Sequence, residues 1–263
     1  MRIFSAATLS FSLVFSFAGI VKADLFTYDF SGTLGNHFHS TTSFDPLVQS
    51  GGQINYDNGN LDSVDDTEGL LANITPEYSE SWVVSIDAGV PTGYENAYVD
   101  AVNQEDYLAA GIVVFYDFMS GNEEFAFEGS LEITEGQRNI LSSADSYNPV
   151  TDTDTLFSDT TTPTNALVET LSIRFDSDSK VLSLIVDGVN LHSIDTDAPA
   201  TDWGMGENDA FQIAIFGTSQ NEAVSSAAPL TLDNYALQFI PEPSTILLAV
   251  AAGLASILCR QRR

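Results

Sequence analysis

The stretch EFAFEGSLEIT, Glu124–Thr134, decides the fold because apolar and polar residues alternate along it. Successive side chains of an extended strand point to opposite faces, so its apolar and acidic residues separate. One face carries Phe125, Phe127, Leu131 and Ile133, and the other carries Glu124, Glu128 and Glu132. This pattern is typical of an antiparallel sheet with one face in a core and one face in water. It predicts an all-β domain.

A second strand pair is expected in KVLSLIVDGVNLHSID, Lys180–Asp195. Asp187 and Gly188 form a two-residue turn of the kind that tight hairpins prefer. That turn fixes the expected register, which pairs Val186 with Val189 and Leu184 with Leu191 on one face.

Other strand-like stretches lie at 25–30, 81–87, 111–118, 168–175, 211–217 and 230–239, separated by polar segments. The longest polar segment, 142–165, is expected to be a loop because it is too polar to pack. So many short strands in one chain predict two stacked antiparallel sheets.

The order TLSIRFDSDSKVLSLIVDG, AFQIAIFG and LTLDNYAL, from 170 to 237, resembles the second half of concanavalin A-like, laminin-G-like jelly rolls. The resemblance implies an antiparallel two-sheet sandwich of that kind, which we place at residues 24–240.

The first 23 residues have the plan of a secretory signal peptide: an early Arg2, an apolar run to Ile20 and small residues before Asp24. We therefore expect an N-terminal signal helix and cleavage by signal peptidase between Ala23 and Asp24. The single cysteine of the chain is Cys259, so no disulfide can form within the exported part.

Charge is distributed very unevenly along the chain. All 37 acidic residues lie between Asp24 and Glu242, against three basic residues in the same interval, which gives that interval a formal charge of −34. Such a surface repels nucleic acid and anionic lipid, so nucleic acid is excluded as a partner. It attracts cations and suits a hydrated extracellular matrix.

The C-terminus, PEPSTILLAVAAGLASILCRQRR, residues 241–263, has three parts in a fixed order. Pro241, Glu242 and Pro243 hold the backbone extended. The 16 uncharged residues 244–259 predict a membrane helix about 24 Å long. A membrane-spanning helix usually has about 20 residues, so this one is short. The basic tail, Arg260, Arg262 and Arg263, is expected to stay in the cytoplasm.

This arrangement resembles the PEP-CTERM sorting signal. The resemblance implies export across the inner membrane of a Gram-negative bacterium that makes exopolysaccharide. It also implies processing by an exosortase, a membrane-embedded cysteine peptidase. The acidic domain would then reach the cell surface or the extracellular matrix.

Several residues are candidates for binding a ligand. Calcium is the candidate cofactor, because hard cations prefer oxygen ligands, with Asp57, Asp62, Asp65 and Asp66 as candidate residues in an otherwise solubilising loop. His37 and His39 would form a metal pair on a strand or lie in a solvated loop. Sugar stacking is a candidate role for Trp203, Tyr94 and Tyr98, although a tryptophan in such a place also often covers the end of a sandwich core.

Catalytic motifs are missing from the sequence: it has no Gly-x-Ser-x-Gly, no His-Glu-x-x-His and no Glu-x-Asp-x-x-Glu run of the laminarinase-like branch of the fold. The acids of EITE, from Glu132, and of ENDAF, from Glu207, have a different spacing. We therefore expect a non-catalytic acidic surface or matrix protein associated with exopolysaccharide. The alternative is a carbohydrate-binding module or a glycoside hydrolase of this fold.

The tail yields a direct prediction, because an extended motif next to a short membrane helix is open to a peptidase. In a host with an exosortase, mass spectrometry of the mature protein should find a C-terminus near Pro243 and no peptide from 246–258. Replacing Pro241, Glu242 and Pro243 by alanine should leave a larger, membrane-associated form. A mature surface protein that still contains Arg263 would show that the tail is an ordinary anchor.

Overall fold

The computed structural model describes residues 25–39, 47–56, 66–93, 107–117, 122–134, 136–220 and 229–241. Strands make up most of the described part, and the one helical element among the described residues is a short 3-10 helix, η1, at Leu34–Asn36. The strands are β1 Leu25–Tyr28, β2 Phe38–His39, β3 Val48–Ser50, β4 Gln53–Tyr56, β5 Asp66–Ala72, β6 Ser81–Gly89, β7 Tyr107–Tyr116, β8 Glu124–Thr134, β9 Gln137–Asn148, β10 Thr153–Pro163, β11 Val168–Asp176, β12 Val181–Val186, β13 Val189–Asp195, β14 Gln212–Gln220 and β15 Leu230–Ile240.

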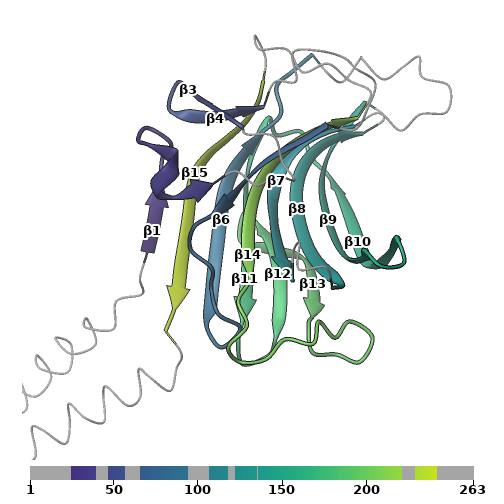
Figure 1. Ribbon diagram of the computed structural model, residues 1–263. Coiled ribbons are helices and arrows are strands. Elements are labelled where there is room, and N and C mark those ends of the chain that lie inside the picture. Colours follow the sequence, from purple (N-terminus) through teal and green to yellow (C-terminus); the bar gives the residue numbers. More distant parts are fainter. Residues whose placement is uncertain are drawn as a thin grey trace, which may run out of the picture. The chain divides into compact units, whose positions relative to one another are not determined.

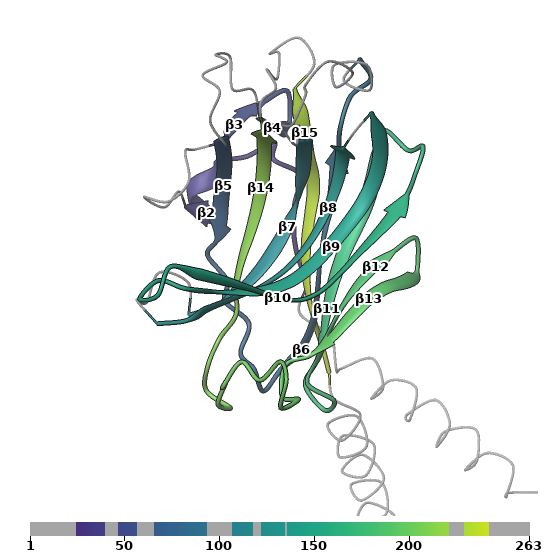
Figure 2. The same cartoon turned by 90° about the vertical axis from the view of Figure 1, so that its right-hand side faces the viewer.

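Two sheets form a sandwich, which confirms the expected fold class (Figure 1). The eight-stranded sheet has the order β13-β12-β11-β6-β15-β4-β3, with β1 paired to β15. The seven-stranded sheet has the order β10-β9-β8-β7-β14-β5-β2, and its strands are visible across Figure 2. The compact unit built by these strands runs from Phe26 to Leu237.

Neither expected flanking helix lies among the described residues, because residues 1–24 and 242–263 fall outside them. Within the described ranges, no helix combines the length and the apolar character needed to cross a membrane.

The core lies between the inner faces of the two sheets. An aromatic cluster fills one part of it, where the ring of Phe211 packs edge-on against Trp82 and Phe175, with centroids 5.3 and 4.8 Å away. All three side chains are fully buried. Burial of such large rings is the main favourable contribution to a fold without disulfides.

Strand β8 forms where its sequence predicts, although its acidic face is less exposed to water than expected, since Glu132 is buried. Phe127, Leu131 and Ile133 are fully buried in the core. Its inner face also carries Gly129, where an added Cβ would meet Cδ1 of Leu184 on β12 at 2.4 Å. The bare backbone of β8 therefore accommodates a leucine from the opposite sheet.

The β12–β13 hairpin confirms half of its expected register. Asp187 and Gly188 both have positive φ, 51° and 76°, and Val186 pairs with Val189 as expected. The pairing of Leu184 with Leu191 is wrong: a bulge shifts the register, and Leu184 pairs with His192. The turn determines only the first two pairs, of which the second is Ile185 with Asn190, because an extra residue in one strand moves all later pairs.

Contacts with the other sheet accompany this shift. His192 bonds the hydroxyl of Ser142 on β9 through Nδ1, at 2.9 Å, and that of Ser158 on β10 through Nε2, at 2.8 Å. Burial lowers the pKa of His192, with the charge of Asp159 acting against it. The ring thus links the edge of one sheet to the edge of the other.

The segment 142–165 is not a loop, which corrects the sequence-based expectation. Most of it belongs to the long β9–β10 hairpin, in which Ser142 pairs with Thr160 and Asn139 pairs with Pro163. Polarity was a poor guide because β10 is an edge strand whose residues are mostly exposed or half-buried. Backbone pairing with β9 orders β10 although it contributes little to the core.

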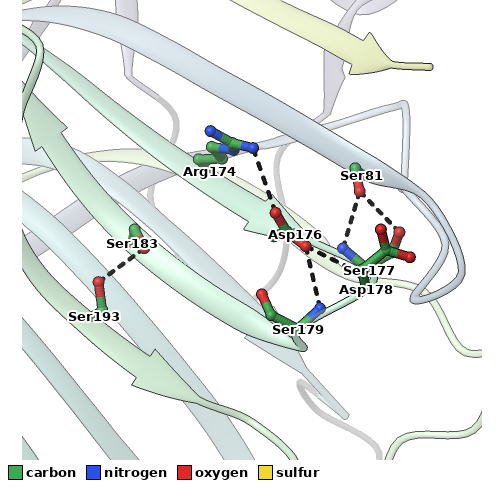
Figure 3. Close-up of polar contacts among 8 residues, drawn as sticks. All are labelled: Ser81, Arg174, Asp176, Ser177, Asp178, Ser179, Ser183 and Ser193. Atoms are coloured by element: carbon green, nitrogen blue, oxygen red, sulfur yellow. Dashed lines mark hydrogen bonds and ion pairs between the residues drawn. The ribbon is translucent and has the colours of Figure 1, made fainter. Parts of the chain in front are cut away.

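The turn between β11 and β12 is stabilised by its own polar groups (Figure 3). Oδ1 of Asp176 accepts hydrogen bonds from the backbone amides of Asp178 and Ser179, at 3.2 and 3.1 Å. Its other oxygen accepts one from Arg174 at 3.4 Å. The amide of Ser179 is the largest of the influences that lower the pKa of Asp176.

Gly129 provides a test of the sheet packing. We expect Gly129→Ala to destabilise the domain by about 2 kcal/mol, because the new methyl group collides with Leu184. In a Leu184→Ala background the same change should cost much less. Gly35→Ala, with nothing within 4 Å of its Cβ position, is the control. Urea unfolding of the four proteins of the cycle measures the coupling, and additive effects would contradict the packing described here.

Candidate functional site

A groove with a volume of about 500 Å³ lies on the outer face of the seven-stranded sheet. We call it the outer groove. Strands β5, β7, β8, β9 and β14 contribute its lining: Thr67, Ala109, Val113, Phe115, Ala126, Glu128, Glu132, Thr134, Leu141, Asp145, Phe216 and Thr218. These residues alternate along their strands with core residues, so one set of strands forms both the core and the groove.

The floor of the outer groove is apolar. Leu71, Ala109, Val113, Ala214 and Phe216 form a cluster of their own, and Phe115 and Ala126 pack against it. A sheet face that turns away from the core normally carries polar side chains. An apolar floor on such a face is therefore a candidate binding surface.

Three carboxylates stand over this floor. Glu128 and Glu132 come from β8, and Asp145 comes from β9. Asp145 pairs with Ala126, which makes it the diagonal neighbour of Glu128 on the same face. Diagonal neighbours lie roughly 7–8 Å apart, whereas Glu128 and Glu132, four residues apart on one strand, have Cα atoms about 13 Å apart.

Glu128 has the most perturbed carboxyl group of the three. Its pKa is raised from 4.5 to about 7, chiefly by burial and in smaller part by the negative charges of Asp145 and Glu132. The hydroxyl of Ser130 donates a hydrogen bond to Oε1 at 2.9 Å and acts in the opposite direction. Glu128 is therefore close to half protonated at neutral pH.

Burial also raises the pKa values of the other two carboxyl groups. A hydrogen bond from Thr134 lowers that of Glu132, and one from Ser143 lowers that of Asp145. The groove thus concentrates negative charge in a place where water screens it poorly.

None of the described residues that line the groove is cationic. Arg138 donates to the backbone oxygens of Val90 and Pro91. Arg174 bonds Asp176, as Figure 3 shows. The ammonium group of Lys180 lies 4.2 Å from the centroid of the Tyr78 ring.

Of the aromatic residues proposed for sugar stacking, only Trp203 is described, and it does not line this groove. Trp203 is 1% exposed and stacks on Phe125 with the ring centroids 5.6 Å apart, so it covers the core, which is the alternative role considered for it. Tyr94 and Tyr98 lie outside the described residues.

The proposed metal sites are not assembled in the described part of the chain. Asp57, Asp62 and Asp65 lie outside it, and Asp66 is the first residue of β5. His37 stacks on Tyr28, whereas His39 bonds the side chain of Asn73, so the two histidines have different partners. Among the described residues, no three His, Cys, Asp or Glu side chains are placed to hold a metal ion.

The processing residues are almost all outside the described ranges. Of the motif Pro241, Glu242 and Pro243, only Pro241 is described, directly after the end of β15. Ala23, Asp24 and the arginines of the tail also fall outside.

Comparison with known proteins identifies the tail. Residues 239–263 match the PEP-CTERM protein-sorting motif. The chain carries a PEP-CTERM sorting signal. This signal implies exosortase processing and a cell-surface or extracellular location in a Gram-negative bacterium. None of the curated proteins matches the sequence of this PEP-CTERM protein.

Solved structures resemble the sandwich at low identity. The endo-1,3-β-glucanase from Streptomyces sioyaensis is 14% identical, with a TM-score of 0.51 over 82% of this chain and 96% of that one. The laminarinase from Flavobacterium sp. UMI-01 is 10% identical, with a TM-score of 0.51 over 84% and 100%. A non-specific endo-β-1,3(4)-glucanase from family GH16 is 11% identical, with a TM-score of 0.51 over 84% and 92%. At these identities the likeness shows the jelly-roll fold alone.

The raised pKa of Glu128 predicts a pH-dependent stability. The unfolded carboxyl group ionises near pH 4.5 and the folded one near 7, so the folded state binds more protons in this interval and loses stability as pH rises through it. Glu128→Gln should therefore be more stable than the wild type by about 2 kcal/mol near pH 8, with little difference near pH 4. The expected difference in stability is smaller than the free energy equivalent to the whole pKa shift, because the side chain of Glu128 is partly exposed.

Asp178→Asn, at the exposed turn of Figure 3, removes one charge elsewhere and is the control. Thermal unfolding at the two pH values measures the difference. An equal effect of Glu128→Gln at both pH values would show that the buried charge costs nothing.

Proposed function

We propose that this PEP-CTERM protein is an exported, exosortase-processed surface protein that holds a segment of polysaccharide in the outer groove without cleaving it. The groove carries the proposal, because it combines an apolar floor with polar groups above it on an open sheet face. Its volume lies within the range of pockets that bind small organic ligands.

A sugar ring fits these two kinds of surface. Its C–H face packs on apolar and aromatic side chains, such as Phe115 and Phe216. Its hydroxyl groups donate hydrogen bonds to carboxylates, such as Glu132 and Asp145. The hydroxyls of Thr67 and Thr218, 2.8 Å apart, add further polar partners at one side of the floor.

The sorting signal supports a role outside the cell. Cleavage of the tail would release an acidic sandwich into a layer that contains polysaccharide. A domain that binds such chains and carries a high charge would stay hydrated and associated with the matrix.

Hydrolysis of the bound chain is the second candidate function, and Glu128 favours it. Glycoside hydrolysis uses one protonated and one ionised carboxyl group, about 5–10 Å apart. Glu128, with a pKa of about 7, suits the proton donor, and its diagonal neighbour Asp145 suits the ionised partner. Glu132, about 13 Å along the strand, is too distant at the backbone to be the natural partner.

Titration calorimetry with soluble β-glucan and with N-acetylglucosamine oligomers tests binding. We expect Phe115→Ala to weaken the affinity by about fivefold, because it removes an aromatic part of the floor. Phe26→Ala on β1, which does not line the outer groove, is the matched control and should leave the affinity unchanged. If the wild type binds neither these chains nor glucosamine oligomers, the proposed function is wrong.

Release of reducing ends separates the two candidates. A non-catalytic protein releases none from either chain. Release that disappears in both Glu128→Gln and Asp145→Asn, while binding persists, would establish hydrolysis instead.

A further inference from the structure

We infer that the outer groove, if it binds polysaccharide as proposed above, selects a chain that carries free amino groups and excludes acidic chains. The inference rests on the charges and shape of the groove, which the proposed function does not itself require. It names the class of chain: an amine-bearing glycan, such as one built from glucosamine.

Charge complementarity is the first argument. The groove presents Glu128, Glu132 and Asp145, and the described part of its lining contains no cationic side chain. A protonated amine has only donors to offer, and carboxylates are the strongest acceptors in proteins. An ammonium group would therefore be bound by charge-assisted hydrogen bonds.

The electrostatic repulsion within the groove points the same way. Burial and mutual repulsion raise the pKa of Glu128, so the ionised form is costly there. A bound ammonium group would stabilise the ionised carboxylates and offset this cost. A neutral sugar would not, and a uronic acid would add a further negative charge.

The shape of the groove favours an amine on a sugar over a divalent metal ion. The described residues offer no group of three ligands close enough to hold a metal. The carboxylates are instead spread along and across the strands, with Glu132 about 13 Å from Glu128 at the backbone. Successive amines on an extended chain can reach such separated carboxylates while the rings pack on the apolar floor.

Acidic chains find no partner here. The three cationic residues between Asp24 and Glu242 are bound to other groups: Arg138 to backbone oxygens, Arg174 to Asp176 and Lys180 to Tyr78. The charge of −34 on this interval also repels a polyanion before contact.

Hexamers of glucosamine, N-acetylglucosamine and galacturonic acid test the selection by titration calorimetry at about pH 6 and physiological salt. The first two share a backbone and differ only in acetylation of the amine. We expect the glucosamine hexamer to bind at least about tenfold more tightly than the acetylated one, and the acidic hexamer not to bind.

Variants assign the effect to the groove. Glu132→Gln and Asp145→Asn should each weaken glucosamine hexamer binding by about tenfold and weaken binding of the acetylated hexamer much less, so that the preference for the free amine falls. Each removes a buried carboxyl group with a raised pKa, so neither change should destabilise the fold. Asp178→Asn, which removes one charge at the turn of Figure 3, should change neither affinity.

The outcomes separate this inference from the proposed function. If the acetylated hexamer binds as tightly as the free amine, the selection is wrong and polysaccharide binding stands. If Asp178→Asn weakens glucosamine binding as much as Glu132→Gln does, attraction is diffuse and the groove does not select. If no hexamer binds, the proposed function itself is overturned.

Discussion

The two-residue repeat of β8 is the constraint on which both the core and the groove depend. Its odd-numbered positions, including Phe127 and Leu131, fill the core, and its even-numbered positions, including Glu128 and Glu132, line the outer groove. A slip of one residue against β7 or β9 would exchange the two faces and bury the glutamates between the sheets. The packing of Leu184 against Gly129 locks this register from the opposite sheet.

Electrostatics makes the groove distinctive within an acidic chain. Most acidic residues of such a chain are solvated and cost little, but Glu128, Glu132 and Asp145 are held together over an apolar floor. Desolvation dominates the pKa shift of each. The fold tolerates this cost because the same strands bury large apolar side chains on their inner faces. The closely spaced carboxyl groups therefore favour positive charge or bound protons in the groove.

The likeness to glucanases extends to the jelly-roll architecture, at identities of 10–14%. The chain has no Glu-x-Asp-x-x-Glu run, and β8 carries Ser130 between its two groove glutamates. The groove residues are therefore interpreted from their own geometry. The two carboxyl groups whose separation would suit glycoside hydrolysis lie on neighbouring strands. They are Glu128 on β8 and Asp145 on β9.

The sequence by itself determined the features that depend on neighbouring residues. The alternation in 124–134 predicted β8, the Asp187–Gly188 turn predicted the first pair of its hairpin, and the order of Pro-Glu-Pro, apolar run and arginines identified the sorting signal. The tertiary structure alone decided the rest. It ordered the polar segment 142–165 as a hairpin, shifted Leu184 onto His192, buried Trp203 and brought Asp145 beside Glu128. The reason is physical: each of these outcomes depends on which strands lie side by side, and pairing across the sheet is set by contacts between residues far apart in the sequence.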